Sequence, residues 1–290
     1  MKYCDLHIHS NASDGTFTPE EIAHRASVHG LSAIAITDHD TVANIHKGQE
    51  AALRYGVEYV PGTEFSTSDL DGRLHMLGYY FDLQDPKLPV FLDKIGNSRK
   101  MRVETICSKL TNLGITCTMA DIEKIAGKAS LGRPHIAEYL INVGIVYNIR
   151  EAFERYLSFG KPAYVEKWAP TPEEIIDFIH SLNGLAVLAH AGVTTGAMEK
   201  IPELIDMGID GIEAYYPRHK HKDQQKLIEY ARANGLAITG GSDCHGVRRG
   251  DPLLGVFKVR YRLVEGLRRK WEEKYGKELN PNSFTPPLKT

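Results

Sequence analysis

The sequence predicts an α/β fold in which strands and helices alternate around a parallel barrel. Apolar, strand-like segments recur between helical ones in the first and last thirds of the chain. Ionisable residues follow the ends of several of these strands, as they do at the C-terminal face of a barrel that carries a site. The middle of the chain is helical, and 290 residues suit one barrel with a small insertion.

Helix starts are marked twice by the same local sequence. Thr18-Pro19-Glu20-Glu21 and Thr171-Pro172-Glu173-Glu174 each place a capping threonine before a helical proline and a capping-box glutamate. Asp69-Leu70-Asp71-Gly72 predicts a hairpin turn that returns through 75–80. In the outer thirds we expect strands over 2–9, 31–37, 57–61, 185–189, 211–215 and 236–240, and helices over 18–29, 42–55, 171–182, 198–207 and 222–234.

The region from about 97 to 159 shows helical periodicities with no strand pattern between them. We therefore expect a discontinuous barrel over 1–96 and 160–279 and an all-helical insertion over 97–159 that overhangs the barrel mouth. Residues 280–290 are expected to form a mobile tail. The expected insertion helices are 99–113, 119–126, 134–143 and 149–157.

The composition excludes some classes of partner. With a net charge of −2 and 25% charged residues, no global field favours long duplex nucleic acid or an anionic membrane. The four cysteines form no C-x-x-C motif and are expected to be reduced structural thiols. There is no signal region at the start and no apolar run near the roughly 20 residues that span a bilayer. We expect a cytoplasmic protein.

Nine potential metal ligands lie along the chain, most of them where a strand ends. Carboxylates and neutral imidazoles are donors that suit Mn, Fe or Zn. With bridging carboxylates and water, this number of side chains would serve about three ions. The nine residues are His7, His9, Asp14, His39, Glu64, His75, His190, Asp243 and His245.

Two ligand pairs strengthen the metal interpretation more than any single residue does. His7 and His9 are two apart on one strand, so both imidazoles project to the same side. Asp243 and His245 repeat this geometry on what is expected to be the last core strand. Because closing a sheet into a barrel makes its first and last strands neighbours, the two pairs are expected to meet.

The remaining ligands are weaker when each is considered alone. Glu64, expected just beyond a strand, is the natural bridging ligand, since its carboxylate has two oxygens for two cations. Asp14 lies in a Ser-Asp-Gly sequence that is equally typical of a turn. His75 and His190 would each also fit a core histidine. Asp38 is expected to accept hydrogen bonds rather than to bind metal, because its side chain should point differently.

Six motifs, in order, resemble the PHP family, which is named after polymerase and histidinol phosphatase. The resemblance covers nearly the whole chain, including the helical insertion. It is closest to the small bacterial phosphoesterases that act on nucleoside 3′,5′-bisphosphates and short RNA 5′ ends. The motifs are Asp5-Leu6-His7-Ile8-His9-Ser10, Ser13-Asp14-Gly15, Ile36-Thr37-Asp38-His39-Asp40, Gly62-Thr63-Glu64, Leu188-Ala189-His190 and Gly241-Ser242-Asp243-Cys244-His245.

The resemblance implies a distorted (β/α)7 barrel with a trinuclear metal centre, so that two to three divalent ions are expected. Some relatives have histidine at the position of Asp14, a difference that bears on metal preference without removing a ligand. The implied ligand sets are His7, His9, Glu64 and Asp243 for one ion, Asp14, His39 and His245 for a second, and Glu64, His75 and His190 for a third.

Three residues are candidates for binding substrate phosphate. Arg133, at the start of an insertion helix, can contact a phosphate in bidentate fashion. In the resembling branch, segments similar to those around Lys161 and His219 line the phosphate side of the pocket. His219 is also a candidate proton donor, and a water is the alternative. The expected catalytic residues are thus Arg133, His219 and Asp243, while the rest of 218–222 is expected to be a solvated helix start.

The sequence therefore predicts a multinuclear metal-dependent phosphoesterase in which a hydroxide bridging two ions attacks phosphorus. The expected partner is a small phosphorylated substrate, either a nucleoside 3′,5′-bisphosphate or the 5′ end of a short single-stranded RNA. Neither duplex nucleic acid nor a membrane is expected. A histidinol-phosphate-type phosphatase, an amidohydrolase-type C–N hydrolase and a non-catalytic metal-binding PHP module stay open as alternatives. The sequence does not indicate an oligomeric state.

Overall fold

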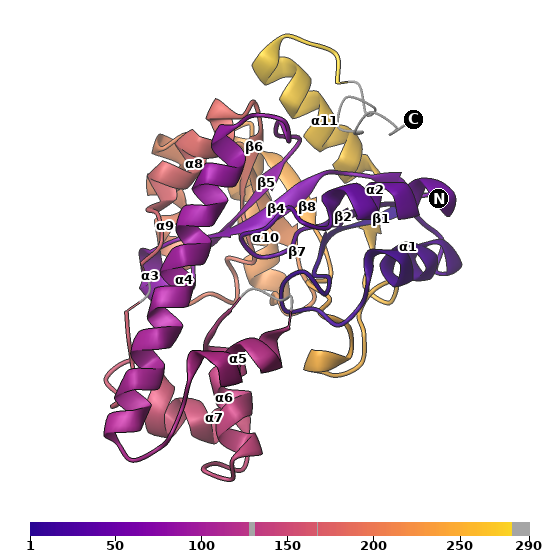
Figure 1. Cartoon of the computed structure of the whole chain (residues 1–290). Helices are drawn as coiled ribbons and strands as arrows, with labels where there is room; N and C mark the ends of the chain where they lie inside the picture. The colour runs from indigo at the N-terminus through magenta and orange to yellow at the C-terminus, as the bar shows by residue number, and fades with distance from the viewer. Residues whose placement is uncertain (128–130, 167, 280–290) are drawn as a thin grey trace. The chain divides into compact units, whose positions relative to one another are not determined.

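The computed structural model describes residues 1–127, 131–166 and 168–279 (Figure 1). The chain forms two compact units, one of Met1–Leu88 with the described part of Pro170–Thr290 and one of Pro89–Ala169. The second unit is longer at both ends than the 97–159 expected, because its first helix begins early and because later residues pack into its core. The expected tail lies outside the described residues.

The first unit contains two sheets. Their strand orders are β3-β2-β1-β9 and β4-β5-β6-β7-β8. The pairs β1–β2, β2–β3, β6–β7 and β7–β8 are parallel, whereas β1–β9, β4–β5 and β5–β6 are antiparallel. The fold is therefore mixed α/β, whereas the sequence predicted parallel strands. The strands are β1 (Tyr3–Ile8), β2 (Leu31–Ile36), β3 (Glu58–Tyr59), β4 (Gly62–Ser66), β5 (His75–Tyr79), β6 (Leu185–Leu188), β7 (Gly211–Tyr215), β8 (Ala237–Gly240) and β9 (Val259–Arg260).

The hairpin of β4 and β5 carries one of the predicted ligands. Ser66 pairs with His75, which confirms the hairpin, and the predicted turn forms the short helix α3 (Asp69–Gly72). Glu64 lies inside β4 and not beyond the end of a strand, so that part of the prediction was wrong. The reason is that β3 is only two residues long and the chain pairs again from Gly62.

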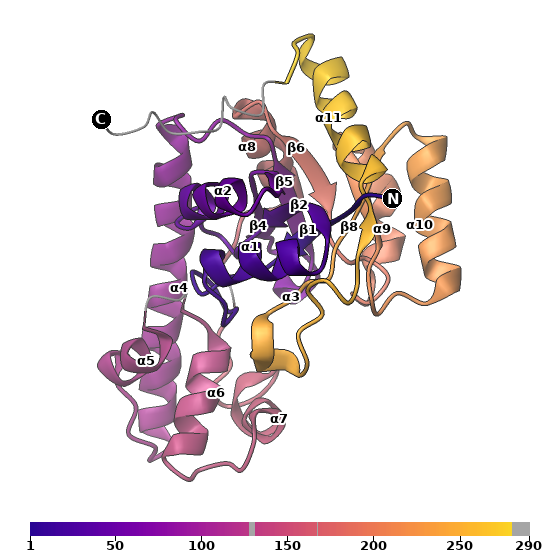
Figure 2. The same ribbon diagram turned by 90° about the vertical axis from the view of Figure 1, so that its right-hand side faces the viewer.

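Helices cover both sheets of the first unit (Figure 2). Both predicted capping boxes are present, with Thr18 accepting from the Glu21 N–H and Thr171 from the Glu174 N–H. Contacts join α1 to β2, α2 to β3, α8 to β5 and β6, and α10 to β7 and β8. The helices are α1 (Pro19–Val28), α2 (Ile45–Arg54), α8 (Pro172–Ser181), α9 (Ala197–Asp206), α10 (His221–Ala233) and α11 (Arg262–Tyr275), with a 3₁₀ turn at Gly246–Arg249.

The pairing of β9 with β1 was not predicted, whereas the adjacency of the first and last core strands was. The last strand, β9, pairs with the first, with Arg260 opposite Tyr3, and α11 then packs against β8. Isolated bridges also link the two sheets, since Ile8 pairs with Cys244 and His39 pairs with Glu64. The bridge between His39 and Glu64 lies within the predicted ligand set.

The second unit contains helices and, within its described residues, no strand, as its sequence periodicity predicted. Its core includes Ile106, Leu110, Ile136 and Leu140, all fully buried. No helix in the described part of the chain is both long and apolar enough to cross a membrane. The helices are α4 (Lys87–Asn112), which begins earlier than expected, α5 (Met119–Ala126), α6 (Arg133–Asn142), α7 (Ile149–Ala152) and the π-helix η1 (Phe153–Leu157).

Candidate metal centre

The first ligand pair lies at the end of β1. His7 is inside the strand, His9 is one residue beyond it, and both side chains are fully buried. The alternation of the strand turns both rings to the same side. Their Nε2 atoms are 3.1 Å apart. Two ring nitrogens this close either share a proton or face a common cation.

The segment after β8 lies beside this pair. The Asp243 N–H donates to the His7 carbonyl at 2.8 Å, and the His9 N–H donates to the Cys244 carbonyl at 2.9 Å. Oδ1 of Asp243 is 3.1 Å from Nε2 of His9. The ring of His245 stacks on that of His9 with centroids 4.1 Å apart. The prediction that the two pairs meet is therefore confirmed.

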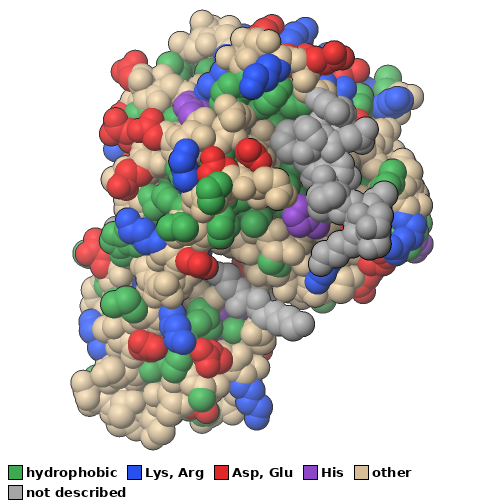
Figure 3. All heavy atoms as spheres, turned by 45° about the horizontal axis from the view of Figure 1, so that its top comes forward, with side chains coloured by type: hydrophobic (Ala, Val, Ile, Leu, Met, Phe, Trp, Pro, Cys, Tyr) green, Lys and Arg blue, Asp and Glu red, His purple; other side chains and the backbone are tan. Residues whose placement is uncertain are grey.

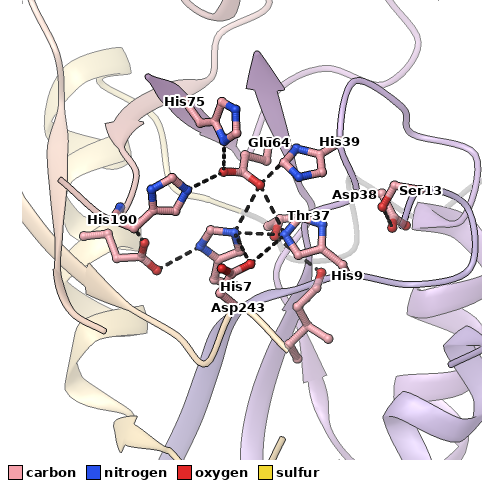
Figure 4. Close-up of polar contacts among 12 residues, drawn as sticks. His7, His9, Ser13, Thr37, Asp38, His39, Glu64, His75, His190 and Asp243 are labelled. Carbon is pink, nitrogen blue, oxygen red and sulfur yellow. Dashed lines mark hydrogen bonds and ion pairs between the residues drawn. The ribbon is translucent and has the colours of Figure 1, made fainter. Parts of the chain in front are cut away.

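Glu64 occupies the centre of the cluster (Figure 4). Its side chain is 1% exposed, and imidazoles from four segments of the chain surround its two oxygens. A buried carboxylate shared in this way suits a ligand that bridges cations. Oε1 is 2.9 Å from His75 Nδ1 and 2.9 Å from His190 Nε2, and Oε2 is 3.2 Å from His9 Nε2, 3.2 Å from His39 Nδ1 and 3.3 Å from His7 Nε2.

Asp14 joins the cluster from the loop that follows β1. Its Oδ1 is 3.1 Å from His245 Nε2, 3.8 Å from His9 Nδ1 and 4.0 Å from His39 Nε2. Among the described residues, the buried ring nitrogens without a hydrogen bond of normal geometry include His9 Nδ1, His39 Nδ1 and His245 Nε2. Two of these nitrogens, on His9 and His245, face Asp14, and the one on His39 faces Glu64. Because buried polar atoms are normally satisfied, such nitrogens beside carboxylates fit a bound cation.

The ligand atoms fall into three overlapping groups, each with its atoms within 4.8 Å of one another. His9 and His39 belong to two groups each, whereas the family resemblance gave each of them to one ion only. His190 reaches the cluster through Glu64. The division of ligands among ions stays a prediction. The groups are His9 with Asp14, His39 and His245; His7 with His9 and Asp243; and His39 with Glu64 and His75.

Two ligand positions have a left-handed backbone. The φ angle is 30° at His190 and 51° at Asp243. For residues other than glycine such a conformation costs about 1–3 kcal/mol and persists only where neighbours hold it. Here the Asp243 N–H is held by β1, and the His190 N–H donates to Glu213 Oε2 at 2.9 Å.

Glu213 supports two ligands and was not predicted. It lies on β7, is fully buried, and its Oε1 is 3.0 Å from Nδ1 of His7. Its other oxygen accepts from the His190 N–H. A carboxylate that fixes the far nitrogen of a metal-binding imidazole sets the orientation and basicity of that ring. The available signal was a glutamate in the otherwise apolar strand Gly211–Tyr215, since an unpaired buried charge is costly.

Two buried aspartates organise the loops around the ligands. Asp38 accepts from the Ser10 N–H at 2.8 Å and from the hydroxyls of Ser10 and Ser13 at 2.5 and 2.6 Å, which confirms its predicted role. Asp5 accepts from the Ser242 N–H at 2.9 Å. Burial raises the pKa of Asp5 to about 7 despite this hydrogen bond.

Opposite charges and burial shift the pKa values of the ligands. Burial raises the pKa of Glu64, but His39 and His75 outweigh it, so this pKa lies well below its usual range. Burial lowers the pKa of His9, but hydrogen bonds to Asp243 and Glu64 raise it to about 10. An ionised Glu64 is the form that binds metal.

A cavity of about 310 Å³ opens onto the cluster. Besides five of the ligands, its lining includes two arginines, Arg73 and Arg218, and the tyrosine Tyr216. Volumes of about 300–1,000 Å³ are usual for small-molecule sites, so this cavity is at the lower end. Its lining consists of His39, Glu64, Gly72, Arg73, His75, His190, Val193, Thr194, Thr195, Tyr216, Arg218 and Asp243.

The three candidate phosphate-binding residues lie in different places. His219 follows β7, and both of its ring nitrogens contact backbone atoms. Arg133 is in the second unit, where its Nη1 donates to the Leu157 carbonyl at 3.0 Å and its guanidinium lies 5.3 Å from the Phe153 ring centre. Lys161 is exposed in the same unit. The phosphate roles of all three stay predictions.

The fold and the site define a class of protein, a mixed α/β chain with a buried cluster of imidazoles and carboxylates, most of them at strand ends. The sequence matches the PHP domain family over residues 5–245. The chain belongs to the PHP domain family, as its motifs predicted.

Similar proteins extend over most of the chain. The 5′-3′ exoribonuclease of Haemophilus influenzae is 36% identical over 251 residues, which cover 84% of this chain and 90% of that protein. The 3′,5′-nucleoside bisphosphate phosphatase of Chromobacterium violaceum is 32% identical over 255 residues, with 86% and 90% covered. A solved structure from Bifidobacterium adolescentis, designated a metal-dependent phosphoesterase, has a TM-score of 0.81 and 28% identity, and the match covers 92% of this chain and 96% of that one.

Proposed function

We propose that this chain is a metal-dependent phosphoesterase that hydrolyses a terminal phosphate of a small nucleotide, such as a nucleoside 3′,5′-bisphosphate, or acts at the 5′ end of a short RNA. The observation that carries the proposal is the buried Glu64 carboxylate with five imidazoles around its two oxygens. The relatives named exoribonuclease and bisphosphate phosphatase support the substrate class. The solved relative designated a metal-dependent phosphoesterase supports the chemistry.

The proposed cofactors are two to three divalent ions, Mn, Fe or Zn. The high share of imidazole donors supports these metals over Mg and Ca, which prefer oxygen. When bound, such ions supply Lewis acidity and lower the pKa of water. The nine residues of the cluster would hold them, with Glu64 and Asp243 balancing their charge and Glu213 orienting His7 through Nδ1.

A distorted (β/α)7 barrel made of β1, β2 and β4–β8 is also part of the proposal. The bridges Ile8–Cys244 and His39–Glu64 support it, because each joins the two sheets through segments near the cluster. In this arrangement β3 and β9 flank the barrel as the ends of the first sheet. Most of the ligands would then lie at the C-terminal ends of the strands, where barrel enzymes carry their sites.

The proposed substrate is small or single-stranded. The cavity has the volume of a small-molecule site, and positive and negative side chains are interspersed on the face shown in Figure 3, in keeping with the net charge of −2. Neither feature supports binding along a long duplex. We propose that Arg133 and Lys161 contribute to phosphate binding. We also propose a cytoplasmic location, which the four free cysteines support.

The decisive experiment is a turnover screen of the purified chain reconstituted with Mn, Fe or Zn. Substrates are a nucleoside 3′,5′-bisphosphate, a short 5′-phosphorylated RNA, histidinol phosphate and an amide panel. We expect two to three metal equivalents and release of phosphate or mononucleotide from the first two substrates. Turnover of amides alone would identify the C–N hydrolase, and metal binding without any turnover would identify the non-catalytic module. Either result would refute the proposal.

A further inference from the structure

The loop after β7 presents an arginine beside the predicted ligand Asp243. The Tyr216 hydroxyl donates to Asp243 Oδ2 at 2.7 Å and accepts a hydrogen bond from Nη2 of Arg218. The same Nη2 is 3.7 Å from Asp243 Oδ2. The guanidinium carbon is also 5.3 Å from the Tyr216 ring centre, within range of a cation–π contact. Tyr216, which is only 3% exposed, thus holds the positively charged guanidinium of Arg218 next to the cluster.

Both ring nitrogens of the neighbouring His219 form hydrogen bonds with backbone groups. Nε2 of His219 accepts from the Gly192 N–H at 3.1 Å, so this nitrogen carries no proton. Nδ1 must then carry the proton, and it donates to the Ala214 carbonyl at 2.9 Å. A Cβ built on Gly192 would lie 2.8 Å from the His219 ring, which shows how closely the two pack. His219 therefore fastens the loop after β6 to the end of β7.

Arg218 has the donors and the exposure that a phosphate ligand requires. A guanidinium offers five N–H donors, and Tyr216 accepts from one terminal nitrogen only. The side chain of Arg218 is 64% exposed and lines the same 310 Å³ cavity as Glu64 and Asp243. A phosphoryl group bound in this cavity next to Asp243 would therefore lie within reach of the remaining donors.

We propose that Arg218, held by Tyr216, binds the phosphoryl group that is transferred and stabilises the charge that develops on its oxygens. The proposal rests on the proposed phosphoesterase function. In the hydrolysis, water adds to phosphorus, the bond to the leaving oxygen breaks, and one proton passes to that oxygen. Arg218 stays protonated throughout and supplies charge and N–H donors. His219 keeps a structural role, in place of the catalytic role that the sequence predicted.

The test compares Arg218→Ala and Arg218→Lys with Lys220→Ala as a matched control. Lys220 is exposed two residues away, loses the same charge on substitution, and is not among the described residues that line the cavity. Each metal-loaded variant is assayed for kcat and KM on a small phosphomonoester, for inhibition by inorganic phosphate and for metal content. His219→Ala is measured in parallel, together with its thermal unfolding.

We expect Arg218→Ala to lose at least about tenfold in kcat/KM and to bind inorganic phosphate more weakly, with unchanged metal content. Lysine should restore part of this loss, since it keeps the charge but not the planar fork, and Lys220→Ala should stay within about twofold of the wild type. The proposal is overturned if the wild type is active and Arg218→Ala has the same kcat/KM. It is also overturned if Arg218→Ala loses metal together with its activity. A wild type inactive on every phosphate ester would instead refute the proposed function itself.

Discussion

Replacing Glu213 should weaken metal binding although this residue belongs to none of the three ligand groups. Its two oxygens contact His7 Nδ1 at 3.0 Å and the His190 N–H at 2.9 Å, and the side chain is fully buried. Glu213→Gln keeps the shape but removes the charge that makes the His7 imidazole more basic. Losing such an outer partner lowers metal affinity by about 10- to 100-fold. This range corresponds to about 1.4–2.7 kcal/mol.

Glu213→Ala should have a second effect, on folding. It leaves two buried donors, one on His7 and one on the His190 backbone, without their acceptor. Each unmade hydrogen bond costs about 1–3 kcal/mol, so unfolding free energy should fall by about 2–6 kcal/mol. Glutamine, which retains an acceptor oxygen, should lose less than alanine.

The assay for Glu213 combines a competitive metal titration against a chromophoric chelator with urea unfolding of the metal-free protein. Glu229→Gln, on the exposed surface of α10, is the matched control and should leave both measurements unchanged. If Glu213→Gln binds each metal as tightly as the wild type, the argument that Glu213 tunes the ligands is wrong. If alanine and glutamine destabilise equally, the two unmade hydrogen bonds are not the cause.

Three further predictions concern single carboxylates. Glu64→Gln should lower the metal stoichiometry by at least one equivalent in elemental analysis, because one bridging charge is lost. Asp243→Ala should abolish turnover in the phosphomonoester assay. Asp210→Asn should lower the unfolding free energy at pH 7 by about 1.5–3 kcal/mol in urea. Burial raises the pKa of Asp210, but hydrogen bonds from His180 and Lys274 outweigh it, so the folded pKa is lowered. The stability that this carboxylate contributes is therefore present above the unfolded pKa of about 3.9 and is lost progressively as pH falls from there through the lower folded pKa, below which variant and wild type should converge.

The ligand positions could be predicted because strand geometry is periodic. Side chains of residues two apart on a strand lie on the same face, and this rule places His7 beside His9 whatever the rest of the fold is. The neighbouring position of Asp243 followed from the prediction that the first and last core strands are adjacent, and the hydrogen bond from its N–H to the His7 carbonyl confirms it. Glu64 was predicted as a ligand but misplaced, because a strand of only two residues precedes β4.

Residues whose role depends on loop conformation could not be predicted in this way. Arg218 and His219 are adjacent, and only the backbone path after β7 decides which of them faces the cavity and which is fastened to Gly192. Glu213 lies in an apolar strand. Its apolar neighbours indicate that it is buried, but they do not indicate which groups its carboxylate contacts. The pairing of Arg260 with Tyr3 joins residues from opposite ends of the chain through a two-residue strand, which is too short to show an alternating pattern.

Some departures from local conformational rules lie within the cluster. His190 and Asp243 hold left-handed backbone conformations, and buried nitrogens of His9, His39 and His245 lack hydrogen bonds of normal geometry. A sequence that specifies one fold satisfies such rules elsewhere and departs from them chiefly at functional positions. A cluster of histidines that met by chance in a core would have been expected to satisfy its nitrogens with ordinary partners. All five residues were predicted as ligands from the sequence, and this coincidence supports a metal centre over accidental packing.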